Sequence, residues 1–280
     1  MKNFYAFSHI PKTAGTSFNE ILLRNFRASR YLNPAHGLYE GPIGKENAKL
    51  YFEDSNDSKI LAGHRVSLNL PFEDLVNGSL TCFTIIRNPL RRLRSEYFYL
   101  KSLKRKIRDP YIEESNCYQE YLEKIINNDK LIMEIGTYQF QFLLQNCENK
   151  NFVHLENLVD DNYFFPMVQE KFIDCMVLLE KFFPVDFKNC SYTIQNVTSH
   201  YNLTKQEIEL EKKVKDKIIK IPNNDLMLWN FANNFIAEKS AYDYFERELH
   251  RMKTRNKLRR MIHSPFLIYS RRFSNLIERI

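Results

Sequence analysis

The chain has 280 residues and a net charge of +7, and 44% of its residues are hydrophobic. This length and composition allow a sizeable packed core, which excludes an intrinsically disordered chain. No N-terminal signal segment and no stretch near the roughly 20 apolar residues of a membrane-spanning helix are found, so we expect a cytoplasmic protein. The five cysteines are scattered and never spaced as C-x-x-C, so we predict reduced thiols and no zinc site.

The positive charge is concentrated at the C-terminus. Residues 250–280 hold nine Lys or Arg and one acidic residue, Glu278, so the rest of the chain carries a net charge of −1. We therefore predict one domain over residues 1–249 and a basic extension over 250–280. The extension would suit an anionic membrane surface or another polyanion, and a solvated tail is the alternative. The neutral body argues against nucleic acid as a partner.

Apolar strand-like runs alternate with amphipathic helical stretches along the chain. The expected strands are Phe4–His9, Lys59–Ala62, Leu80–Ile86 and Cys175–Leu179. The expected helices are Thr16–Ala28, Pro71–Val76, Pro89–Leu103, 117–127, 137–146, 161–172, one from a capping box at Thr204–Glu207 to about Lys220, and 224–249. This alternation predicts an α/β fold, with a central, mostly parallel sheet between two helical layers. Residues 29–58 lack periodicity and are interpreted as an irregular excursion.

A loop rich in small residues, PKTAGTS, follows the first expected strand at Pro11–Ser17. A strand-loop-helix arrangement presents backbone N–H groups and the positive end of the helix dipole to an anion. Ala14 and Gly15 leave room for a phosphate, and Lys12 supplies a positive charge. The hydroxyl donors of the loop are Thr13, Thr16 and Ser17. The loop therefore predicts a phosphate site, with an ordinary strand-to-helix turn as the alternative.

A second anion-binding segment, CFTIIRNPLRRLRSEY, follows the third expected strand. Arg87 stands at the end of that strand, and Ser95 lies two turns into the next helix. Because α/β folds bind ligands at the carboxyl edge of the sheet, we expect Arg87 and Ser95 to face one anion. We interpret Arg91 and Arg94 as solvated helix residues.

Together the two segments resemble the sulfotransferases that use 3′-phosphoadenosine 5′-phosphosulfate (PAPS), in the carbohydrate group related to heparan sulfate 2-O-sulfotransferase and its bacterial relatives. In that family a P-K-[TA]-A-[GS]-T-S loop binds the 5′-phosphosulfate, and an R-[DN]-P-x-x-R-x-x-S-x-Y segment binds the 3′-phosphate. Residues 11–17 match the first pattern throughout. The second is matched by Arg87–Pro89, Arg92, Ser95 and Tyr97. The resemblance implies the P-loop-like sulfotransferase fold, PAPS as donor, and a hydroxyl of an oligo- or polysaccharide as acceptor.

The resemblance also suggests a general base. The family often has Gly-His after a strand between the two segments, and this chain has Gly63-His64 there. Imidazole has a suitable pKa for accepting the proton of a hydroxyl. We predict that His64 is the base and that Lys12, without a metal ion, stabilises charge on the leaving phosphate. His36 is the second choice, followed by a carboxylate, Glu53 or Asp54.

Three further segments resemble parts of the family. They are Val177–Glu180 as a strand, Asn196–Thr198 as a loop over the nucleotide, and Asp225–Phe235 as the terminal helix. Similarity is weakest at 29–58 and 104–150, where we expect the acceptor side.

Two alternatives from other classes remain open. One is a P-loop nucleotide kinase, although Lys12 precedes Gly15 where the Walker pattern requires the opposite order. The other is a binding protein that acts through the basic extension.

Overall fold

In the computed structural model, the described residues are 2–26, 29–32, 43–53, 59–75, 78–103, 109–145, 147–193 and 201–277. Their centre is a five-stranded sheet in the order β2-β3-β1-β4-β5, and every pairing in it is parallel. The strands are β1 (Lys2–Ser8), β2 (Ser29–Leu32), β3 (Lys59–Gly63), β4 (Gly78–Ile86) and β5 (Phe164–Val168).

The middle strand, β1, positions both predicted anion-binding segments. It pairs with β3, where Phe7 lies opposite Ala62, and with β4, where Ser8 lies opposite Thr84. The first two predicted strands are therefore neighbours, as expected. Residues 4–8 of β1 and 80–86 of β4 are buried, as is typical of parallel strands covered on both faces.

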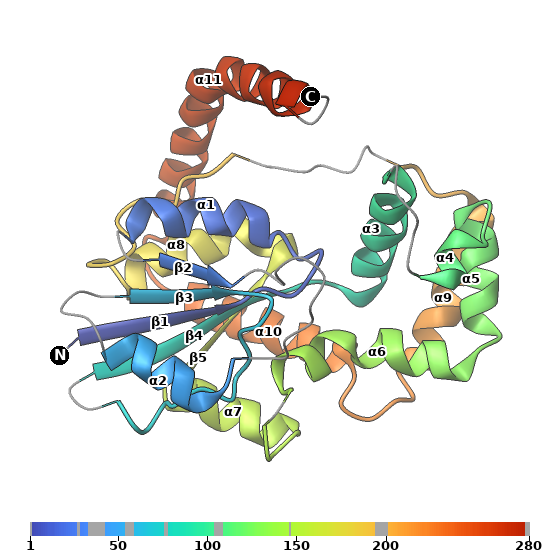
Figure 1. Ribbon diagram of the computed structural model, residues 1–280, viewed down its shortest axis with the longest axis horizontal. Coiled ribbons are helices and arrows are strands. Elements are labelled where there is room, and N and C mark those ends of the chain that lie inside the picture. Colours follow the sequence, from blue (N-terminus) through green and yellow to red (C-terminus); the bar gives the residue numbers. More distant parts are fainter. Residues whose placement is uncertain are drawn as a thin grey trace.

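Helices cover both faces of the sheet (Figure 1), which confirms the predicted α/β fold with its central parallel sheet. On one face lie α1 (Gly15–Asn25) and α8 (Phe172–Phe182), and on the other lie α2 (Lys45–Glu53) and α7 (Phe152–Asp160). In α1, Phe18, Ile21 and Leu22 are fully buried because their spacing places them on one side of the helix.

A group of helices lies beyond the carboxyl ends of the strands (Figure 1). Its members are α3 (Pro89–Ser102), α4 (Pro110–Glu113), α5 (Tyr118–Ile126), α6 (Asp129–Leu143) and α9 (Lys205–Ile218). They share a second hydrophobic cluster that includes Leu93, Leu122 and Val214. The predicted capping box is present at the start of α9, where Thr204 and Glu207 bond reciprocally.

The predicted helix over 224–249 is two helices, α10 (Asp225–Ser240) and α11 (Phe245–Ile277), because the backbone turns between them and Tyr244 has φ 76°. Leu249, Met252 and Asn256 recur on one side of α11 and are buried, and α11 packs on α8. The boundary that we expected at residues 249/250 therefore falls inside a packed helix.

Two element predictions are wrong in a related way. The predicted strand Cys175–Leu179 and the strand-like segment Val177–Glu180 lie in helix α8. The predicted helix 161–172 instead contains strand β5 and a short 3₁₀ turn, Gln169–Lys171. All five residues of Cys175–Leu179 are buried, and a short continuous apolar run fits a buried helix as well as a strand. Residues 71–75 are not helical, and the excursion 29–58 contains β2 and α2.

Candidate functional site

The loop after β1 has an unusual backbone. Lys12 and Ala14 have φ angles of 69° and 68°, in the left-handed region that non-glycine residues seldom adopt, and such strain concentrates at functional sites. The backbone N–H groups of Ser17 and Phe18 donate to the carbonyl of Ala14 at 3.1 and 3.2 Å. The preceding N–H groups at the start of α1 have no partner within the helix, so this end can receive an anion.

The position of the His9 ring requires glycine at position 15. An ideal Cβ at Gly15 would lie 2.0 Å from the His9 ring, so no other residue fits without moving that ring. The His9 ring stacks on Phe7 and, at 4.1 Å between centroids, on the ring of His64. Burial lowers the pKa of His9 to about 3, so its imidazole is neutral and serves as packing beneath the loop.

His64 follows β3 and lies beside the loop through this stack. Its Nδ1 lies 2.6 Å from the backbone oxygen of His9. A carbonyl only accepts, so Nδ1 carries the proton and Nε2 of the neutral ring carries the lone pair. Burial lowers the pKa of His64, which keeps the ring neutral near pH 7. Gly63, at φ 135°, makes the turn that leads into His64.

Lys12 is held over an aromatic ring that the sequence did not indicate. Its Nζ lies 3.5 Å from the centroid of Tyr99, on α3. Burial, with the nearby Arg87, lowers the pKa of Lys12 to about 8. A half-buried ammonium that loses hydration in this way is well placed to gain from an incoming anion.

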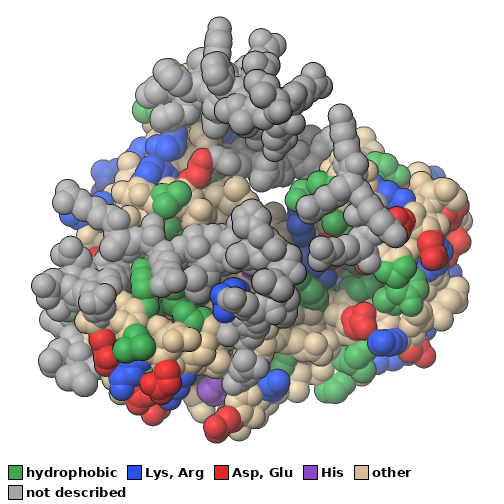
Figure 2. Space-filling view, viewed as in Figure 1, with side chains coloured by type: hydrophobic (Ala, Val, Ile, Leu, Met, Phe, Trp, Pro, Cys, Tyr) green, Lys and Arg blue, Asp and Glu red, His purple; other side chains and the backbone are tan. Residues whose placement is uncertain are grey.

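Arg87 joins the two predicted segments. Its Nη1 donates to the backbone oxygen of Lys12 at 2.9 Å, while its buried Nε has no partner among the described residues. Burial and the neighbouring arginines lower the pKa of Arg87 to about 10. Ser95 is buried on the following helix, α3. Side chains of Lys and Arg lie in the recess between the sheet and the helical group (Figure 2).

Not all side chains of the two segments lie as the sequence predicts. The Thr13 hydroxyl is buried and donates to the carbonyl of Ile10 at 2.8 Å, so it braces the loop instead of facing a ligand. Ser17 is buried and Thr16 is exposed. Arg94 is not a solvated residue, because it forms a bidentate pair with Glu211 at 2.7 and 3.0 Å. Arg91 is exposed as expected.

The alternative candidates for the general base lie away from the loop or outside the described residues. Glu53 ends α2, is exposed, and lies 3.9 Å from Lys49. His36, Asp54 and the predicted nucleotide loop Asn196–Thr198 are outside the described residues. Over the ranges that the structure describes, no group of three or more His, Cys, Asp or Glu is arranged to hold a metal ion, and no helix is both long and apolar enough to span a membrane.

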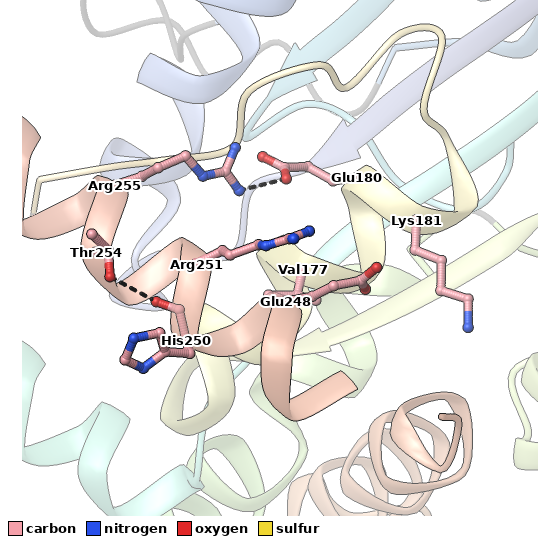
Figure 3. A pocket seen from close by; sticks show the side chains of 8 residues that line it. All are labelled: Val177, Glu180, Lys181, Glu248, His250, Arg251, Thr254 and Arg255. Carbon is pink, nitrogen blue, oxygen red and sulfur yellow. Dashed lines mark hydrogen bonds and ion pairs between the residues drawn. The ribbon is translucent and has the colours of Figure 1, made fainter. Parts of the chain in front are cut away.

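A cavity of about 630 Å³ lies away from these residues, between α8 and α11 (Figure 3). Arg251, Arg255 and Glu180 line it, and Arg255 bonds Glu180 at 2.6 Å. None of the predicted site residues borders this cavity. The site that they form is instead the strand-loop-helix junction at the carboxyl edge of the sheet, where Lys12, His64 and Arg87 come from β1, β3 and β4.

Comparisons with known proteins identify the family of the chain. No curated protein sequence matches the chain significantly. A solved structure of a mouse sulfotransferase complexed with PAP matches with 12% identity and a TM-score of 0.35, covering 90% of this chain and 89% of that one. A sequence model of the sulfotransferase family matches residues 2–270, nearly the whole chain. The chain therefore belongs to the sulfotransferase family.

Proposed function

We propose that the protein transfers a sulfuryl group from PAPS to a hydroxyl of an oligo- or polysaccharide. The observation that carries the proposal is the hydrogen bond from Arg87 to Lys12, which brings the two anion-binding segments together at one edge of the sheet. The 5′-phosphosulfate would lie on residues 12–17, and the 3′-phosphate on Arg87 and Ser95. Nε of Arg87, which has no partner among the described residues, and the N–H groups at the start of α1 fit a ligand with two anionic groups.

The residues of the site have separate roles in this reaction. The acceptor oxygen forms a bond to sulfur as the bond from sulfur to the 5′-phosphate oxygen breaks, and the electron pair of that bond stays on the phosphate. Nε2 of His64 takes the proton of the acceptor hydroxyl. Lys12 and the N–H groups of the loop stabilise the negative charge that develops on the leaving phosphate. No metal ion is required in this scheme.

The carbohydrate acceptor is supported by the resemblance to the heparan sulfate 2-O-sulfotransferase group. The helical group lies beyond the carboxyl ends of the strands (Figure 1), and its helices α4–α6 fall within residues 104–150, where we expect the acceptor side.

The direct experiment measures release of 3′-phosphoadenosine 5′-phosphate (PAP) from PAPS, with and without a panel of polysaccharides and with EDTA. We expect release that depends on a polysaccharide and continues in EDTA. Phosphoryl transfer from ATP with magnesium, and none from PAPS, would favour the kinase alternative.

Replacing Arg87 by alanine should weaken PAP binding by about 1.5–3 kcal/mol, the value of a hydrogen bond to a charged group, or roughly 10- to 150-fold. Binding of adenosine 5′-monophosphate (AMP), which lacks the 3′-phosphate, should change little. Calorimetric titration measures both, and the control is Arg91→Ala, at an exposed position on helix α3, which follows Arg87. An equal loss for both nucleotides would place the 3′-phosphate elsewhere.

Residues 257–261 of α11 form a basic surface, which we propose contacts anionic lipid. Leu258 and Met261 are 54% and 64% exposed, and Lys257 and Arg260 beside them are exposed as well. Basic and apolar side chains together on one helix are typical of helices that lie on anionic membranes.

Truncation after Asn256 tests this surface, because it removes residues 257–261 and keeps the buried side of α11, with Leu249, Met252 and Asn256. We expect unchanged PAP affinity, and a loss of binding to phosphatidylserine vesicles relative to the full chain at low salt. Equal vesicle binding by the truncated chain would refute the contact, as would binding of the full chain to a soluble polyanion alone.

A further inference from the structure

One buried side-chain amide holds the backbone of Arg87. Oε1 of Gln139 accepts the backbone N–H of Arg87 at 2.9 Å, and Nε2 of Gln139 donates to the backbone oxygen of Arg87 at 2.8 Å. Arg87 directly follows β4, whose last residue, Ile86, lies opposite Val168 of β5. The Gln139 amide, from α6, therefore bonds the peptide groups of Arg87 where the strand pairing ends, much as another strand would.

Asp225 fixes the orientation of that amide. Its Oδ2 accepts from the backbone N–H of Gln139 at 2.9 Å and from Nε2 at 3.3 Å, and its Oδ1 accepts from the backbone N–H of Phe140 at 2.9 Å. An ionised carboxylate can only accept, so the NH₂ group of Gln139 must lie toward Asp225. Oε1 of Gln139 is then the atom that accepts the backbone N–H of Arg87. Burial raises the pKa of Asp225 to about 6, which leaves it ionised at pH 7.

Both members of this network are enclosed. Gln139 and Asp225 are fully buried, so neither can exchange these hydrogen bonds for bonds to bulk water. The two residues come from α6 and from the start of α10, and Arg87 comes from the end of β4. The network therefore ties the helical group to the edge of the sheet at the residue that we assign to the donor.

Fixing the backbone of Arg87 also affects how its guanidinium can bind a ligand. Its Nη1 bonds the backbone oxygen of Lys12, and its Nε is buried without a partner among the described residues. A long side chain loses conformational freedom when it binds a ligand, and a fixed backbone lowers that cost.

We propose that Gln139, held by Asp225, is a positioning residue that directs Arg87 toward the 3′-phosphate of the donor. This inference rests on the proposed function. It predicts that Gln139 determines affinity for nucleotides that carry a 3′-phosphate, while the transfer step itself proceeds normally once the donor is bound.

Gln139→Leu removes both bonds to Arg87 with little change in volume. We expect PAP affinity to fall about 5- to 150-fold, the combined effect of two neutral hydrogen bonds. AMP affinity should stay within about twofold, and kcat at saturating PAPS should be retained while KM for PAPS rises. The matched control is Gln141→Leu on the same helix, because Gln141 is exposed and bonds only Thr137 among the described residues.

A second pair of variants tests the orientation without removing the side chain. Gln139→Glu places a carboxylate against Asp225 and should lower PAP affinity further than Gln139→Leu does. Adding Asp225→Asn supplies an amide donor to that carboxylate, so the double variant should bind PAP more tightly than Gln139→Glu alone. Melting curves of all variants establish that each is folded.

The outcomes separate this inference from the proposed function. If the wild-type chain does not prefer PAP over AMP, the proposed function itself fails, and the inference with it. If the wild type prefers PAP and Gln139→Leu keeps that preference, only the positioning role is overturned. An equal loss of PAP and AMP affinity, or no rescue in the double variant, would show a purely structural role and would also overturn it.

Discussion

Replacing His64 by alanine is expected to lower kcat by about 10²–10⁴, the usual contribution of a general base, with little change in PAP affinity. The reason is the geometry of the ring, since its Nδ1–H is bound to the carbonyl of His9 and its Nε2 holds the lone pair. Steady-state turnover with PAPS and an acceptor measures the loss. His250→Ala is the control, because His250 is exposed on α11.

The pH profile gives an independent test of His64. Burial lowers its pKa, so the neutral form that accepts a proton persists to below pH 6.5, the ordinary value for histidine. Activity should therefore fall on the acid side only below pH 6.5. Near-normal turnover of His64→Ala would refute the assignment, and His36 would become the residue to test.

Replacing Lys12 by alanine is expected to lower kcat by about 10²–10³, the effect of removing one group that stabilises developing charge. Lys12 is the only lysine of the loop Pro11–Ser17. The same turnover assay measures the loss, and Lys49→Ala on α2 is the control. A Lys12→Ala variant that loses PAP affinity but keeps kcat would instead assign Lys12 to ground-state binding.

The basic side of the pH profile should report Lys12. Its pKa is lowered to about 8, so in the free enzyme the ammonium loses its proton as the pH rises through that value, and kcat/KM should decrease. An anionic ligand favours the charged form, so the corresponding limb of kcat should lie at higher pH. Lys12→Arg should remove the basic limb of kcat/KM. A limb that remains in this variant would have to come from another group.

The sequence predicted the parts of the site that depend on local order along the chain. A loop of small residues after a buried strand, and an arginine at the end of another buried strand, are features of consecutive residues. In a parallel sheet such positions meet at one edge, which is why Lys12 and Arg87 could be placed together before the fold was known.

Contacts between distant segments could not be predicted in the same way. The requirement for glycine at position 15 comes from the ring of His9, which reaches beneath the loop. In the sequence, Gln139 is one of several polar residues of α6, and only the tertiary fold brings its amide to Arg87 at the end of β4. Tyr99 is far from Lys12 in the sequence, and the two meet only because the fold places α3 beside the loop that contains Lys12.

The exchange of strand and helix around β5 and α8 has a different cause. Both segments are apolar and buried, so periodicity carries no information about which is which. Pro166 lies within β5, and its missing N–H is tolerated there because β5 is at the edge of the sheet.

In the proposed function, the edge of the sheet formed by Lys12, His64 and Arg87 binds a nucleotide with phosphates at both the 3′ and 5′ positions. Calorimetric titration of the full chain with PAP, AMP, and ATP with magnesium tests it most directly. We predict binding of one PAP per chain, without added metal, that is at least about tenfold tighter than binding of AMP, in proportion to a charged hydrogen bond. Tighter binding of ATP with magnesium, together with equal affinities for PAP and AMP, would exclude PAPS as the donor.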